Sequence, residues 1–152
     1  MRENGSMVKL FTIGFTNKSA EEFFNLLCNN KVSKIIDTRI NNISQLAGFT
    51  KEIDLKYFAK KIGNIEYEHK IDYAPTKELL SRYRHKDITW KQYEKEYLSL
   101  LKTRNIKQKT NIADFNYNCF LCSEHLPDKC HRRILVEYFK ALSSDLQIIH
   151  LI

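Results

Sequence analysis

Short apolar runs alternate with amphipathic segments along this chain, and the alternation limits the folds open to it. The apolar runs are rich in β-branched residues, whereas the segments between them show the three- and four-residue spacing of helices. Strands are expected at residues 8–13, 32–38, 65–71, 116–122 and 147–152. Strands that alternate with helices are typical of a mainly parallel sheet covered on both faces. We therefore predict a three-layer α/β domain with five strands.

Capping residues mark where the helices begin. Ser19 and Glu22 have the spacing of a capping box, Gly63 suits the end of the second helix, and Asp128 suits the start of the last. Helices are expected from Ser19 to about Asn30, from Asp54 to Ile62, from Thr76 to about His85, from Thr89 past Leu101, and from about Lys129 to Leu142.

The sheet is expected to be Rossmann-like. Right-handed crossovers leave few topologies, and a strand order of 3-2-1-4-5 would put the first and fourth strands side by side. Ligands of open α/β sheets bind at such a switch point, beyond the carboxyl ends of the strands. Gly14, Arg39 and Cys122 would then face one crevice. We expect a single domain over residues 8–152 after a flexible tail at 1–7.

Positive charge is concentrated in one segment of the chain. Residues 77–109 hold ten lysines and arginines against four acidic residues, a net charge of +6 out of the chain's +7. A basic stripe of this kind is typical of proteins that bind nucleic acid or another polyanion. The alternative is a solvated, lysine-rich helical surface.

Apolar runs of only a few residues predict no membrane span, and no apolar signal region begins the chain, so a cytoplasmic location is expected. Four cysteines in such a chain are expected to be reduced thiols. A catalytic or metal role for some of them is therefore a reasonable hypothesis.

Reactive side chains gather between Phe120 and Arg133. An apolar run ends on Cys122, a polar loop follows, and an amphipathic segment then begins. If Asp128 caps that helix, Cys130 and His131 fall in its first turn. Free backbone N–H groups and the helix dipole there favour a thiolate at Cys130 or a bound phosphate, with Arg132 as a bidentate partner.

Zinc is the rival interpretation of the same stretch. Cys122, His125, Cys130 and His131 are all competent ligands, in the spacing C-x2-H-x4-C-H. This spacing is not that of a standard zinc finger, and adjacent ligands in a helical turn would have to diverge. A purely structural role for both thiols is the other alternative. No cofactor is required by the sequence; a soft metal such as zinc would use Cys122, Cys130 and His131.

A second cluster follows the strand expected at 32–38. Asp37 and Arg39 end this buried run, where parallel sheets place their ligands. They could bind a ligand, or they could form an ion pair that only fixes the following loop.

A series of short motifs runs along the chain. They are Thr12-Ile13-Gly14 with Asn17 and Ser19, Asp37-Thr38-Arg39 with Ser44, Gly48-Phe49-Thr50-Lys51, Trp90, and Leu121-Cys122-x-Glu124-x5-Cys130-His131-Arg132. Through these motifs the chain resembles, from residue 8 to 152, the DUF488 family of uncharacterised proteins, and the last motif is the most specific of them. The resemblance implies an α/β fold and a shared site, but no reaction.

The function expected from these features is that of a small intracellular enzyme acting on a phosphorylated or nucleotide-type anion. Its expected catalytic groups are Cys122, Glu124, Cys130 and His131. Anion binding is expected of Arg39, Arg132 and Asn17, with Asp37 and Gly14 in support. The alternative is a nucleic-acid-binding module that uses the basic surface of residues 77–109. Its partner would be DNA or RNA. The resemblance adds a loose association of relatives with DNA repair.

Overall fold

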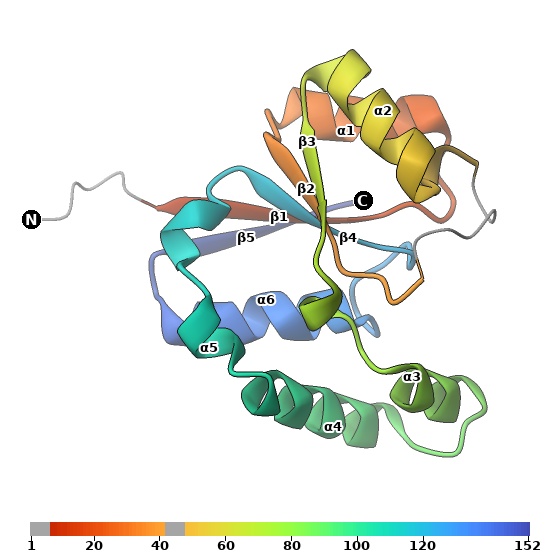
Figure 1. Ribbon diagram of the computed structural model, residues 1–152, viewed down its shortest axis with the longest axis vertical. Helices are drawn as coiled ribbons and strands as arrows, with labels where there is room; N and C mark the ends of the chain where they lie inside the picture. Colours follow the sequence, from red (N-terminus) through yellow and green to blue (C-terminus); the bar gives the residue numbers. More distant parts are fainter. Residues whose placement is uncertain (1–6, 42–47) are drawn as a thin grey trace, which may run out of the picture.

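Five parallel strands form a single sheet in the computed structural model, which describes residues 7–41 and 48–152 (Figure 1). The strands are β1 (Val8–Gly14), β2 (Lys34–Asp37), β3 (Glu66–His69), β4 (Asn118–Cys122) and β5 (Leu146–Leu151). The predicted α/β class and the five-stranded parallel sheet are confirmed. Residues 1–6 of the expected tail and Ser44 of the shared motifs lie outside the described residues.

The strand order is β3-β2-β4-β1-β5, which differs from the expected 3-2-1-4-5. β1 and β4 are neighbours as expected, but β4 lies between β1 and β2, and β5 pairs with β1 at the sheet's edge. All five residues of β4 are buried, as suits a strand in the middle of a sheet. The consequence is that β4, which ends on Cys122, is flanked by the ends of both β1 and β2.

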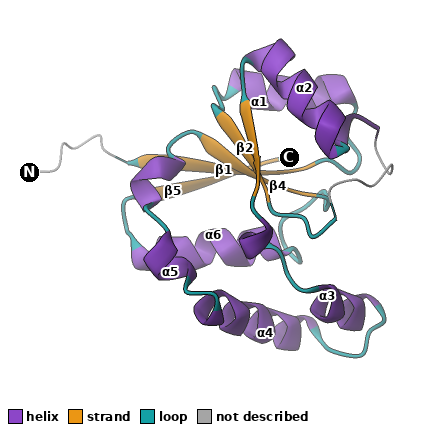
Figure 2. Cartoon of the chain, in the orientation of Figure 1, coloured by secondary structure: helices purple, strands orange, loops and turns teal. Residues whose placement is uncertain are grey.

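Helices cover both faces of this sheet (Figure 2). They are α1 (Ala20–Asn29), α2 (Glu52–Gly63), α3 (Lys77–Arg84), α4 (Trp90–Thr103), α5 (Ile106–Lys109) and α6 (His131–Leu142). One apolar core joins α1 and α2 to the first face, and a second joins α6, α4 and α3 to the other. α5 and three single-turn 3-10 segments (Gly48–Thr50, Ile71–Tyr73 and Ile112–Phe115) were not expected from the sequence.

The predicted caps at Ser19, Thr76 and Thr89 are confirmed, since each hydroxyl accepts a backbone N–H from the first turn of its helix. The expected cap at Asp128 is wrong. The Cys130 N–H donates to the Pro127 carbonyl in a turn, so that α6 begins only at His131.

The end of α2 also differs from expectation. Gly63 is the last residue of the helix, and the cap is Asn64, whose φ of 54° lies in the left-handed region. Asparagine tolerates that conformation better than most residues. Within residues 7–41 and 48–152, no helix has both the length and the apolar character needed to cross a membrane.

Candidate functional site

The carboxyl ends of three adjacent strands bring the predicted site residues together. Gly14 at the end of β1 pairs with Cys122, and Asp37 at the end of β2 pairs with Leu121. The loop from residue 123 to 130 then returns the chain to the start of α6. Open α/β sheets place their ligands at this edge, so the strand register itself assembles the site.

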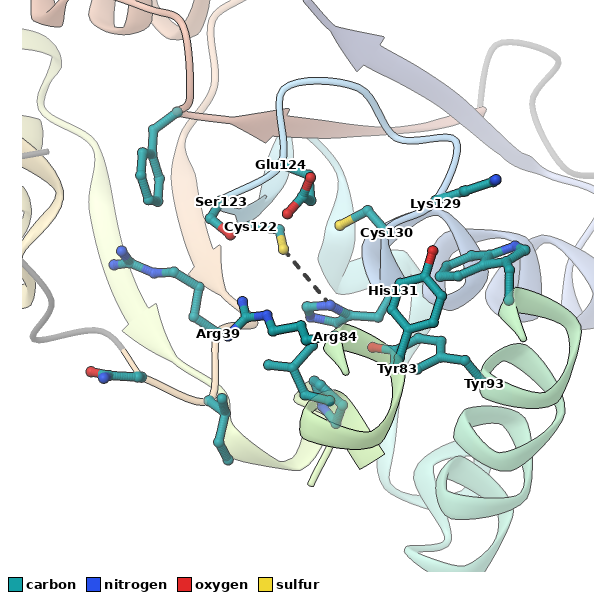
Figure 3. A pocket seen from close by; sticks show the side chains of 16 residues that line it. Arg39, Tyr83, Arg84, Tyr93, Cys122, Ser123, Glu124, Lys129, Cys130 and His131 are labelled. Atoms are coloured by element: carbon teal, nitrogen blue, oxygen red, sulfur yellow. Dashed lines mark hydrogen bonds between the residues drawn. The ribbon is translucent and has the colours of Figure 1, made fainter. Parts of the chain in front are cut away.

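Cys122, Cys130 and His131 meet at one point (Figure 3). Their sulfur and ring nitrogen atoms all lie within 4.8 Å of one another, and Cys122 Sγ lies 3.7 Å from His131 Nδ1. All three side chains are buried, with 6% or less of each residue exposed. We call these three residues the Cys-Cys-His trio.

The imidazole of His131 is held in one orientation by the end of β2. Its Nε2 lies 2.8 Å from the Thr38 carbonyl oxygen, which can only accept a hydrogen bond, so Nε2 carries the proton. The Tyr97 ring packs against the imidazole edge to face. His131 therefore presents Nδ1, rather than Nε2, to the sulfur of Cys122.

Charge within the trio is shared unequally. A hydrogen bond from the Cys130 thiol, followed by the charges of His131 and Arg132, holds the pKa of Cys122 well below its usual value against the opposing effect of burial. Burial and the adjacent Cys122 sulfur raise the pKa of Cys130. Burial lowers the pKa of His131, but the Cys122 sulfur and the Thr38 carbonyl together raise it above its usual value. A negative charge within the trio is therefore favoured on Cys122 over Cys130.

Arg132 supports the loop rather than the cavity. Its guanidinium is fully buried and donates from Nη1 to the Glu124 carbonyl at 2.7 Å and from Nη2 to the His125 carbonyl at 3.3 Å. Nη1 also lies 3.6 Å from Cys130 Sγ. Its position does not match the expected contact with a bound anion, because these donors are directed at the chain's own atoms. What Arg132 supplies to the site is positive charge beside the thiols.

Asp37 and Arg39 form a buried bidentate ion pair. Arg39 donates to the two carboxylate oxygens from Nε at 2.9 Å and from Nη2 at 2.7 Å, and the Tyr67 hydroxyl adds a bond of 2.6 Å to Oδ2. Arg39 Nη2 also donates to the Thr50 carbonyl. The sequence left open whether Asp37 and Arg39 bind a ligand or form an ion pair that fixes the following loop. These hydrogen bonds directly perform the second role.

A cavity of about 400 Å³ opens above the trio. Its walls come from the ends of β1 and β2, from α3 and α4, and from the loop before α6. Four lining residues are basic or imidazole groups: Arg39, Arg84, Lys129 and His131. Four are aromatic: Phe15, Tyr83, Trp90 and Tyr93. Among the described lining residues, Glu124 is the one carboxylate.

The predicted site residues fall into three groups in this structure. Those that line the cavity are Arg39, Cys122, Glu124, Cys130 and His131. A second group, Asp37, Arg132 and Gly14, lies behind the cavity. The loop after β4 approaches Gly14 so closely that a Cβ there would stand 1.5 Å from the Glu124 carbonyl oxygen, so only glycine fits at this position. Asn17 is exposed in a turn with a φ of 63° and does not line the cavity.

Sequence reasoning missed the wall that α3 and α4 contribute. Arg84 and Tyr83 end α3, Tyr93 lies in α4, and Lys129 precedes α6. Only tertiary packing brings the first three near Cys122, and no local pattern in the sequence distinguishes them from neighbouring basic and aromatic residues. Trp90, one of the residues shared with the DUF488 family, also lines the cavity.

Comparison with known proteins identifies the family but no activity. A family model described as "Domain of unknown function DUF488" matches residues 19–139, which is most of the chain and includes the whole Cys-Cys-His trio. Neither the curated proteins nor the solved structures gave a match. The chain therefore belongs to the DUF488 family.

Proposed function

We propose that the protein is an enzyme that acts on a small anionic substrate bound in this cavity, with the Cys-Cys-His trio as its reacting centre. The observation that carries the proposal is the placement of three reactive side chains at the base of a cavity whose described wall carries three cations, Arg39, Arg84 and Lys129, and one carboxylate. Small-molecule sites typically enclose about 300–1,000 Å³ with a few convergent polar groups. Perturbed thiol and imidazole pKa values in a cleft are a further mark of such sites.

Charge on the cavity wall favours an anion. Arg84 and Lys129 are exposed, whereas Arg39 is 5% exposed and its guanidinium is fixed by Asp37. Cations grouped around a concave, partly apolar surface raise the local concentration of anionic ligands. Glu124 also lines the cavity, and its carboxylate is the group that we assign as general acid or base toward a bound substrate.

The aromatic wall favours a substrate with a flat apolar part. The rings of Trp90 and Tyr93 are stacked with centroids 5.1 Å apart, and Tyr83 packs against both. Such surfaces accept a planar ring by stacking, while the cations accept the charge. A phosphorylated compound of nucleotide type satisfies both halves of the cavity.

Binding of nucleoside monophosphates tests this proposal. They are expected to bind more tightly than the matching nucleosides, and Arg84→Gln or Lys129→Gln is expected to weaken binding of the phosphorylated form by about three- to tenfold, as loss of one exposed charge contact would. Calorimetric titration measures both. Lys91→Gln is the matched control, because Lys91 lies on another face of α4, away from the cavity. Equal affinity for nucleoside and monophosphate would contradict the proposal.

Nucleic-acid binding by residues 77–109 has weaker support. Two of the arginines in that segment are already engaged: Arg82 pairs with Glu96, and Arg104 donates to the carbonyls of Asp72 and Ala74. Lys91, Lys95 and Lys102 do line a shallow depression on α4. The same titration with a single-stranded oligonucleotide separates the two functions, since Lys91→Gln would weaken only oligonucleotide binding.

A further inference from the structure

The geometry points to a metal centre: we infer that Cys122, Cys130 and His131 bind one zinc ion at the base of the cavity. The inference deepens the proposed function by naming the cofactor of its reacting centre, and it rests on that function only for the ion's use in catalysis. Thiolate sulfur and imidazole nitrogen are the ligands that zinc prefers in proteins.

Distances within the trio suit a tetrahedral ion. Zinc bonds of about 2.3 Å to sulfur and about 2.0 Å to nitrogen place neighbouring ligand atoms roughly 3.5–3.8 Å apart. Cys122 Sγ and His131 Nδ1 are already 3.7 Å apart, and every pair in the trio lies within 4.8 Å. Small side-chain rotations would therefore close the three ligands on one ion.

Adjacent residues converge here because only one of them is helical. Cys130 is the N-cap of α6, with extended backbone angles of −137° and 141°, and His131 is the first residue of the helix. The sequence-based objection to zinc assumed that both lay in a helical turn and had to diverge. The turn from Pro127 to Cys130 removes that objection.

The surroundings of the trio provide the hydrogen bonds that support metal ligands. Metal-binding histidines typically donate their second ring N–H to a carbonyl or carboxylate. His131 does so from Nε2 to the Thr38 carbonyl, which leaves Nδ1 for the ion. Arg132 Nη1 lies 3.6 Å from Cys130 Sγ, where it would stabilise that sulfur as a thiolate.

Charge compensation gives an independent argument. Arg132 places a cationic donor beside the buried sulfur of Cys130, yet two adjacent thiolates on Cys122 and Cys130 would repel each other. A divalent ion between them neutralises both charges. The cations on the cavity wall then remain available for an anionic substrate.

Three protein ligands leave a fourth position open. Structural zinc sites fill all four positions with protein atoms, whereas catalytic sites keep one for water or substrate. His125, the fourth candidate ligand in the sequence, instead lies 3.5 Å from the Lys18 ammonium and outside the trio. The open position would face the cavity that Glu124 also lines, which suits Lewis-acid activation of water or of a substrate oxygen.

Metal analysis of the full chain tests the inference. Protein purified without chelator is expected to contain about one zinc per chain, and Cys122→Ser and Cys130→Ser are expected to bind zinc at least about 100-fold more weakly. Cys28→Ser is the control, because Cys28 is a half-buried thiol in α1, apart from the trio. Unchanged zinc affinity in the two trio variants would overturn the assignment.

A measurement on the unmodified chain covers the case in which a variant fails to fold. Metal-free protein loaded with cobalt(II) is expected to show thiolate-to-cobalt charge-transfer absorption, and a competing chelator should give a zinc dissociation constant of about nanomolar or tighter. Absence of the absorption, or zinc binding weaker than about micromolar, would overturn the inference. Monophosphate binding by metal-free protein is a separate measurement, so the proposed function can stand or fail independently.

Discussion

Replacing Asp37 with alanine is expected to lower the free energy of unfolding by about 3–5 kcal/mol. The carboxylate is fully buried and accepts four hydrogen bonds, three from Arg39 and one from the Tyr67 hydroxyl. Its removal would leave the guanidinium of Arg39, which is 5% exposed, as a buried charge without its anion. Denaturant unfolding followed by circular dichroism measures the loss.

Lys60→Ala is the matched control for this prediction. Lys60 and Glu66 also form an ion pair, but both side chains are more than half exposed. Solvent screens such a pair, so stability close to that of the unaltered chain is expected. If Asp37→Ala were as mild as Lys60→Ala, the buried pair could not be what fixes the end of β2.

Gly14→Ala is expected to destabilise the fold by about 1–3 kcal/mol and to weaken both zinc and monophosphate binding. The added methyl carbon would stand 1.5 Å from the Glu124 carbonyl oxygen and 3.0 Å from Arg132 Nη1. Backbone must therefore move. That carbonyl oxygen is also the acceptor for Arg132, so the loop before α6 would shift together with Cys130.

Gly48→Ala provides the comparison, since a Cβ at Gly48 meets nothing within 4 Å among the described residues. It should leave thermal unfolding and zinc affinity nearly unchanged. An alanine at position 14 that preserved zinc affinity would show that the close approach of β1 to the loop is unrelated to the site.

Local patterns in the sequence were sufficient to predict the five strands, five of the six helices and the cluster of reactive side chains. The capping hydroxyls of Ser19 and Thr89 correctly predicted where two helices begin. Such caps are visible in a sequence because the capping residue and its hydrogen-bond partner lie within one helical turn. Cys122, Cys130 and His131 lie within ten residues, so their grouping was visible before any fold was known. The resemblance to the DUF488 family rested on the same residues and is confirmed.

Long-range features could not be predicted in this way. The pairing of β5 with β1, and of β2 with β4, depends on which strands exclude the most apolar surface from water together. Arg84 reaches the cavity only because α3 and α4 fold across this end of the sheet. One premise of the sequence-based argument against zinc was wrong, since Asp128 suggested a helix start two residues too early.

Selective alkylation of Cys122 tests the central claim most directly, which is that a reactive sulfur faces a cationic cavity. Iodoacetate and iodoacetamide attack the same thiolate, so their rate ratio does not depend on the pKa of the thiol. In metal-free protein at low salt, we expect the ratio of the iodoacetate rate to the iodoacetamide rate at Cys122 to exceed the same ratio for glutathione by about tenfold or more. The preference should fall at high salt and in the Arg84→Gln, Lys129→Gln double variant. A ratio equal to that of glutathione, mapped to Cys122 by mass spectrometry, would contradict the account.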